Sequence, residues 1–220
     1  MPKPIIATTL SGLFIKSEPW KKAHVLWFKR AAEELEDSKV KEYADKDDYF
    51  KYVDKVMQRL HPHKMFERQR TAKARSIYFE YVCSIISKQP NKFVNKDVVE
   101  YFKSLKNNYR LALITTNTRE SIDKIFSYTK LEGLFNLIEL SYEDEKDDKT
   151  VVFDRFIRNY GKPVVYIGGD RKDSFEYCMD NSIPCIFANL EGDEGSDYAE
   201  TVHTLEELKK SLEEKGINNE

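Results

Sequence analysis

Cysteine is scarce in this chain of 220 residues, and the cysteines do not occur in close pairs. Cys83, Cys178 and Cys185 are odd in number and far apart, and no Cys-x-x-Cys spacing is present. A zinc cluster or a disulfide framework is therefore not indicated. Because a free cysteine usually behaves as a small core residue, we expect all three to be buried and reduced.

Long hydrophobic runs and an excess of one charge are also missing. No stretch approaches the roughly 18 apolar residues that a membrane-spanning helix needs, and the first ten residues are too polar for a secretory signal. The 36 basic and 38 acidic side chains nearly cancel, so no overall field attracts nucleic acid or an anionic membrane. We therefore expect a cytoplasmic protein that does not bind membranes, and we do not expect nucleic acid as a partner.

The sequence does contain short apolar runs that alternate with amphipathic segments. Runs at residues 5–7, 111–114, 137–140, 164–167 and 184–187 are typical of buried strands. Strands separated by helices in this way predict right-handed crossovers and a parallel sheet that is covered on both faces. The predicted fold class is α/β, with a Rossmann-like, doubly wound parallel sheet.

The segment between the first two strands has a different pattern, with helical spacing and no convincing strand. Ser17 precedes Glu18 and Pro19 in a helix start, either Asp45 or Asp47 is the expected cap of a second helix, and a third helix is expected from Thr71 to Lys88. His61 and His63 flank a proline and are expected in a turn. We predict an all-helical cap at residues 17–89, inserted into a core domain made of residues 1–16 and 90–220.

Ligands of open parallel sheets bind at the carboxyl ends of the strands. Four such ends carry polar residues, at 8–12, at 115–118, around residue 149 and at 168–173. At these places the chain resembles the haloacid dehalogenase-like superfamily, in the branch with a helical cap after the first strand. The resemblance extends over nearly the whole chain and implies the same fold, with a phosphate site at the strand ends.

Two motifs of this resemblance concern phosphate. The strand 111–114 is followed by Thr115, which takes the position of the family's phosphate-binding hydroxyl, and Thr116 is the alternative in a register shifted by one residue. Lys149 falls where the family's lysine neutralises the phosphate, and Lys146 is the alternative. Without the resemblance, Lys149 is a solvated lysine in a charged loop.

A third motif concerns magnesium, a hard ion that prefers oxygen ligands. In one register Asp170 and Asp173 match the family's metal-binding aspartates. In the other register Gly169 occupies the first aspartate position and only Asp173 matches. Independently of the resemblance, Asp170 would cap the next helix and Asp173 would interact with its positive end.

The first motif departs from the family. The resemblance implies an aspartate nucleophile and a second acidic residue two positions later, but here these positions are Thr8 and Leu10. No Asp or Glu precedes Glu18, so no shift of register restores a carboxylate. A hydroxyl without an adjacent base is a poor nucleophile, and Leu10 cannot transfer a proton. Magnesium binding is expected to be weak at best.

These observations leave three functional hypotheses. The first is a non-catalytic or strongly impaired family member that binds a phosphorylated small molecule. The second is a magnesium-dependent, phosphatase-type hydrolase with an atypical nucleophile. The third is an interaction protein with an unknown protein partner. For the first, hydroxyls, backbone N–H groups and a lysine suit an anion, and the expected phosphate-binding residues are Thr8, Thr9, Ser11, Thr115, Thr116 and Lys149.

Overall fold

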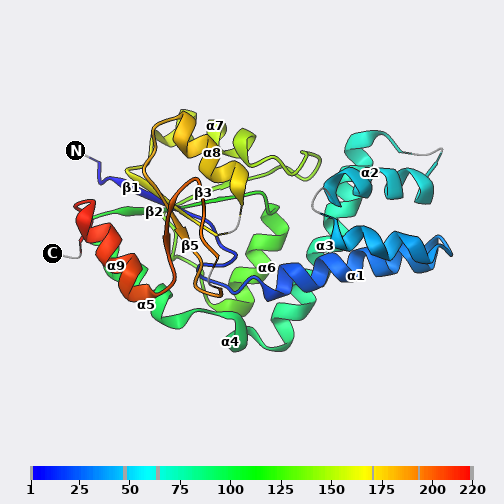
Figure 1. Cartoon of the computed structure of the whole chain (residues 1–220), viewed down its shortest axis with the longest axis horizontal. Helices are drawn as coiled ribbons and strands as arrows, with labels where there is room; N and C mark the ends of the chain where they lie inside the picture. The colour runs from blue at the N-terminus through cyan, green and yellow to red at the C-terminus, as the bar shows by residue number, and fades with distance from the viewer. Residues whose placement is uncertain (1, 47–48, 63–64, 170, 193, 219–220) are drawn as a thin grey trace.

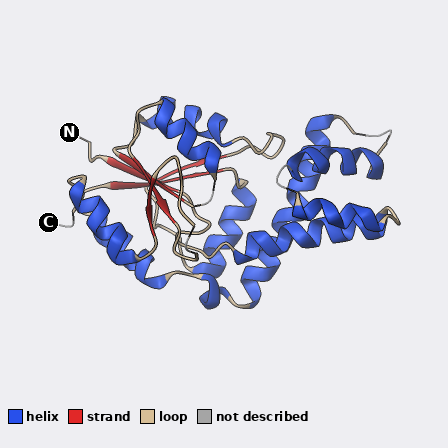
Figure 2. Cartoon of the chain, in the orientation of Figure 1, coloured by secondary structure: helices blue, strands red, loops and turns tan. Residues whose placement is uncertain are grey.

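The sheet has the predicted parallel, doubly wound arrangement (Figures 1 and 2). The computed structural model describes residues 2–46, 49–62, 65–169, 171–192 and 194–218. In this part of the chain, six parallel strands lie in the order β3-β2-β1-β4-β5-β6. The strands are β1 Ile5–Thr8, β2 Arg110–Thr115, β3 Leu137–Leu140, β4 Val165–Gly168, β5 Cys185–Ala188 and β6 Glu200–Val202. The strand order reverses between β1 and β4, which is where a ligand crevice is expected.

Helices cover both faces of the sheet because alternate residues of the central strands point to opposite sides. On one face, Ile6 and Leu111 share a buried cluster with side chains of α5, α6 and α9. On the other face, Ile5 and Ala112 pack with side chains of α7 and α8. These helices are α5 Lys96–Leu105, α6 Arg119–Thr129, α7 Lys149–Tyr160, α8 Lys172–Asp180 and α9 Leu205–Glu214.

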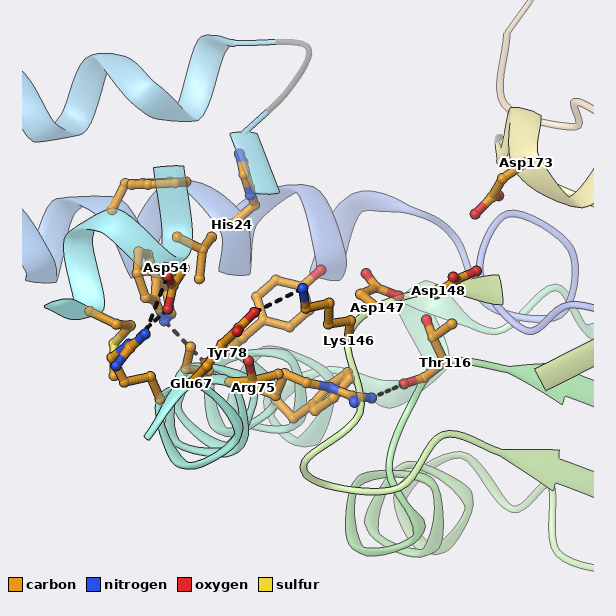
Figure 3. Close-up of a pocket in the computed structure, with 18 residues that line it drawn as sticks. His24, Asp54, Glu67, Arg75, Tyr78, Thr116, Lys146, Asp147, Asp148 and Asp173 are labelled. Atoms are coloured by element: carbon orange, nitrogen blue, oxygen red, sulfur yellow. Dashed lines mark hydrogen bonds and ion pairs between the residues drawn. The ribbon is translucent and has the colours of Figure 1, made fainter. Parts of the chain in front are cut away.

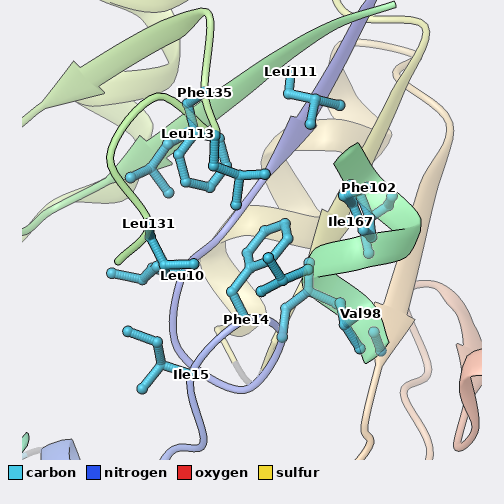
Figure 4. Close-up of a cluster of buried hydrophobic side chains, with 14 of the residues drawn as sticks. Leu10, Phe14, Ile15, Val98, Phe102, Leu111, Leu113, Leu131, Phe135 and Ile167 are labelled. Carbon is cyan, nitrogen blue, oxygen red and sulfur yellow. The ribbon is translucent and has the colours of Figure 1, made fainter. Parts of the chain in front are cut away.

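The turn that follows β1 belongs to the hydrophobic core (Figure 4). Leu10 and Phe14 have no exposed surface. The ring of Phe14 makes edge-to-face contacts with Phe102 and Phe135, at centroid distances of 4.9 and 5.3 Å. Burying a leucine side chain stabilises a fold by about 1.5–3 kcal/mol. Position 10 therefore serves packing in this protein.

The chain between β1 and α4 forms a group of helices beside the sheet (Figure 2), and we call it the cap. No strand occurs among the described residues of the cap. Trp27, Phe28 and Met57 belong to a hydrophobic cluster of its own. The helices are α1 Glu18–Glu34, the 3-10 helix η1 Ser38–Asp45, α2 Tyr49–Leu60 and α3 Glu67–Lys88, and the short α4 Pro90–Phe93 follows.

Several local predictions need correction. The helix α3 begins at Glu67, four residues before the predicted start. Asp45 ends η1 instead of capping α2, and Asp47 and His63 lie outside the described residues. Cys83 and Cys178 are buried as expected, but Cys185 is only partly buried. No described helix is long and apolar enough to cross a membrane.

Candidate functional site at the strand ends

Thr8, at the expected nucleophile position, is the last residue of β1 and lies between two neighbouring strands. Its register partners are Leu113 of β2 and Ile167 of β4. The side chain has no exposed surface, and its hydroxyl donates a hydrogen bond to the carbonyl oxygen of Ala112 at 3.1 Å. The hydroxyl proton is therefore used within the sheet.

The loop after Thr8 lies close against the end of β4. The backbone N–H of Thr9 donates to the carbonyl oxygen of Ile167 at 3.1 Å. A Cβ atom at Gly169 would lie 2.7 Å from the carbonyl oxygen of Ser11, a distance that real Cβ atoms essentially never show. In the register that gives Gly169 the aspartate position, a carboxylate would collide with this loop.

The end of β2 places the two candidate phosphate-binding threonines next to each other with different partners. Thr115 is buried, and its hydroxyl oxygen accepts a hydrogen bond from the N–H of Asn117 at 3.2 Å. The hydroxyl oxygen of Thr116 accepts one from Arg171 Nη1 at 3.3 Å. Both residues therefore hold polar atoms at the sheet edge where a ligand is expected.

Lys149 is the first residue of α7, and its side chain is almost completely buried at 2% exposure. Its ammonium group donates to the carbonyl oxygen of Ile114 in β2. Burial, and secondarily the positive charge of Arg171, lowers the pKa of Lys149 to about 7. Lys146, the alternative, is exposed and forms an ion pair with Glu67 of the cap at 2.8 Å. Lys149 is thus the lysine that the fold brings to the end of β2.

Arg171 connects two carboxylates at the strand ends. Its Nη1 lies 2.7 Å from Asp147 Oδ1, and its Nη2 and Nε lie 2.5 and 3.1 Å from the two oxygens of Asp173. Burial alone would lower the pKa of Arg171, but the two carboxylates outweigh it and raise that pKa above its ordinary value. In turn Arg171 outweighs the effect of burial on Asp147, whose pKa is lowered.

No pattern in the sequence predicts this pair of contacts. Asp147 and Arg171 are 24 positions apart in separate loops, and no motif links them. The only available signal was the position of Arg171 inside the motif that contains Asp173.

The described residues at the strand ends do not fit magnesium. No group of three or more His, Cys, Asp or Glu side chains is placed to hold a metal ion in the described part of the chain. The positions of Thr8 and Gly169 supply no carboxylate, and both oxygens of Asp173 accept hydrogen bonds from Arg171. Asp170, the remaining candidate ligand, lies outside the described residues.

A cavity of about 610 Å³ lies between the cap and the strand ends (Figure 3). Its core end is formed by Thr116, Lys146, Asp147, Asp148 and Asp173, and its other walls come from α1, α2 and α3. A volume of this size is in the range of small-molecule sites. The cavity was not foreseen from the sequence, because it depends on how the cap lies against the core.

Arg75 of α3 joins the cap to the core at this cavity. Its guanidinium donates to the carbonyl oxygens of Tyr142 and Glu145, at 2.8 and 2.6 Å, and to that of Thr116. It also lies 3.2 Å from the hydroxyl oxygen of Ser141. Only 9% of Arg75 is exposed, and burial lowers its pKa. One buried cation of the cap therefore fixes the ends of β2 and β3.

These features define an α/β protein with a helical cap over the carboxyl ends of a parallel sheet. A sequence profile described as haloacid dehalogenase-like hydrolase matches residues 20–188, and the chain belongs to this family. A search of curated protein sequences found no match.

Similar solved structures support the same fold. A predicted phosphatase from Clostridium acetobutylicum has a TM-score of 0.65 at 16% identity, with 97% of this chain and 100% of that chain covered. A phosphatase of the family from Thermococcus onnurineus has a TM-score of 0.62 at 18% identity, covering 96% and 98%. CbbY from Rhodobacter sphaeroides, in complex with phosphate, has a TM-score of 0.61 at 13% identity, covering 94% and 96%. At these identities the similarity concerns the fold.

Proposed function

We propose that this chain is a non-hydrolysing member of its family, and that it binds a phosphorylated small molecule between the cap and the core. The observation that carries the proposal is that the side chains at positions 8 and 10 are both buried and have structural roles. The hydroxyl of Thr8 is buried and bonded to Ala112, and Leu10 is packed in the core. Neither position presents a nucleophile or a proton donor to the cavity.

The chemistry of hydrolysis argues in the same direction. General acid–base catalysis alone contributes about 10²–10⁴-fold to a typical enzyme rate, and Leu10 has no proton to transfer. A threonine attacks only when a neighbouring base removes its proton, whereas the partner of Thr8 is a carbonyl oxygen. We therefore expect no rate above that of water.

The strand ends retain groups that suit an anion. Lys149 is buried beside a carbonyl oxygen, with no carboxylate in direct contact among the described hydrogen bonds and ion pairs. An anion placed next to it would stabilise its charged form. The hydroxyls of Thr115 and Thr116 lie at the same edge of the sheet. Arg171 already balances Asp147 and Asp173, so binding would not require a metal ion.

The experiment has a catalytic and a binding arm. In the first, the purified protein is incubated with p-nitrophenyl phosphate, with magnesium or with a chelator, and we expect equal background rates. A magnesium-dependent rate that disappears in Asp173→Asn would establish the alternative, a phosphatase-type hydrolase, and overturn the proposal.

In the second arm, binding of inorganic phosphate is measured by calorimetry. We expect Lys149→Met to abolish binding, because Lys149 is buried at the end of β2 and has no carboxylate partner among the described ion pairs. Lys146 lines the cavity but is paired with Glu67, so Lys146→Met should weaken binding less than Lys149→Met does. Equal binding by both variants would place the anion elsewhere. Absence of binding by the unmodified protein would remove the phosphoryl ligand from the proposal.

A further inference from the structure

The two ends of the cavity differ in chemical character. The cap contributes the apolar side chains of Trp27, Phe28, Val53, Met57, Ala74 and Phe79, beside the polar or charged ones of His24, Asp54, Glu67, Arg70, Thr71, Arg75 and Tyr78. The core end instead contributes Thr116, one lysine and three aspartates. A ligand that fills this cavity therefore meets polar groups at one end and hydrocarbon at the other.

Several polar groups of the cap wall are already engaged with protein partners. The indole N–H of Trp27 donates to the carbonyl oxygen of Ala74 at 3.1 Å. Asp54 accepts a hydrogen bond from Arg70 Nε at 2.8 Å. His24 Nε2 lies 3.0 Å from the carbonyl oxygen of Ala44. Burial also lowers the pKa of His24, which favours its neutral form. The cap wall is thus poorly suited to bind a chain of hydroxyl groups.

The three aspartates of the core end have partners within the protein. Asp147 and Asp173 pair with Arg171. Asp148 accepts hydrogen bonds from the backbone N–H and the hydroxyl of Thr150 at the start of α7. Asp147 and Asp173 therefore do not require a cationic ligand to neutralise them, whereas the described partners of Asp148 are neutral donors.

We infer that the ligand of this site carries an apolar body, aromatic or branched, that enters the cap, and that it is not a sugar phosphate. The inference rests on the proposed function for the phosphoryl end of the ligand. A buried hydroxyl that loses its hydrogen bonds to water without replacement costs about 1–3 kcal/mol. Buried apolar surface instead gains about 25 cal/mol per Å². The cap wall therefore favours a ligand whose part inside the cap is apolar.

The test compares four probes by calorimetry: inorganic phosphate, ribose 5-phosphate, 2-naphthyl phosphate and 2-naphthol. We expect 2-naphthyl phosphate to bind at least about tenfold more tightly than ribose 5-phosphate, the ratio that 1.4 kcal/mol produces. Thr71→Phe, which adds a ring at the cavity wall, should remove this preference. Lys73→Phe is the matched control, because Lys73 is exposed on the same helix and does not line the cavity.

A second variant is needed because the added ring of Thr71→Phe could also displace the cap. Val53→Asp places a charge on the apolar wall. It should weaken the binding of 2-naphthyl phosphate and leave the binding of inorganic phosphate unchanged. The thermal unfolding of each variant shows whether it is folded.

Each outcome decides a different claim. Equal affinities for the two phosphate esters would overturn the inference and leave phosphoryl binding intact. Binding of 2-naphthol as tight as that of its phosphate, with no binding of inorganic phosphate, would support the apolar site and refute the phosphoryl end. Failure of all four probes to bind would overturn both.

Discussion

Arg171 holds the carboxylate of Asp173 through two hydrogen bonds, of 3.1 Å from Nε to Oδ1 and 2.5 Å from Nη2 to Oδ2. The same guanidinium reaches Asp147 from the other side, at 2.7 Å. Paired geometry of this kind favours arginine, whose planar group donates in fixed directions. The side chain of Arg171 thus neutralises the carboxylates of Asp147 and Asp173 at the strand ends.

We expect Arg171→Gln to lower the free energy of unfolding by about 1.5–3 kcal/mol, the range for a hydrogen bond to a charged group. The free energy of unfolding of Arg171→Lys should lie between that of Arg171→Gln and that of the unmodified protein, because an ammonium group cannot reproduce the planar contacts of the guanidinium. Urea unfolding measures the change. Arg119→Gln is the control: its ion pair with Asp123 is 3.8 Å long and exposed, so no change is expected. Equal stability of both variants would show that the bridge of Arg171 is without consequence.

Magnesium should not stabilise the unmodified protein. A ligand that binds only the folded state raises stability according to its concentration and Kd, but both oxygens of Asp173 are engaged by Arg171. Thermal unfolding with 10 mM magnesium, a concentration about 10⁴ times a Kd of 1 μM, should match unfolding with chelator. An increase in Tm that Asp173→Asn abolishes would contradict this expectation and restore a metal site.

The ends of strands can be predicted from the sequence because apolar runs mark the strands. The run before Thr115 and the run before Gly168 became β2 and β4. The edge strand β6 was not predicted, because only Val202 of its three residues is buried. Asn95 precedes α5, but its side-chain amide does not cap that helix and instead donates to the carbonyl oxygen of Leu13 at 2.7 Å. Local patterns cannot show such distant partners.

The charged contacts of the site were beyond the sequence for the same reason. In the sequence Arg75 follows Arg68, Arg70 and Lys73 closely, a pattern that is typical of a solvated helix face. It is instead buried against the carbonyl oxygens of Tyr142 and Glu145, which are 67 and 70 positions away. Helical periodicity gives the face on which a residue lies, but it does not give the domain that covers this face.

Lys149 is expected to make stability depend on pH. Its pKa of about 7 in the folded state lies below the ordinary value, so between these two values the unfolded chain binds more protons than the folded protein. The contribution of Lys149 to stability therefore rises with pH from about pH 7 upward. Lys149→Met should remove this dependence and raise the free energy of unfolding at pH 7, because hydrocarbon replaces a buried group whose charged form is desolvated. Urea unfolding from pH 6 to 9 measures both effects, and an unchanged pH profile would show that Lys149 is not desolvated.

Arg75 should control the contact between the cap and the core. Arg75→Met removes the donors to Tyr142, Glu145 and Thr116, so we expect faster amide exchange in the loop 141–148 and in α3. Arg68→Met is the control on the same helix, because Arg68 is exposed and lies 3.7 Å from Asp144. Hydrogen exchange detected by mass spectrometry compares the two. If both variants exchange like the unmodified protein, the cap is held by other contacts.

Restoring the family's acidic residues should not restore hydrolysis. Leu10→Asp places a carboxylate in a fully buried apolar cluster, and an unpaired buried charge destabilises a protein by several kcal/mol. Leu10→Met keeps the volume and should cost less than about 1.5 kcal/mol. Thermal unfolding, followed by the phosphatase assay on Thr8→Asp with Leu10→Asp, tests this. A stable double variant with magnesium-dependent turnover would mean that the loop after β1 can turn position 10 toward the cavity, so that side-chain identity alone removed the chemistry. A destabilised, inactive double variant, beside a stable Leu10→Met, would show that the loop itself has been rebuilt as part of the core.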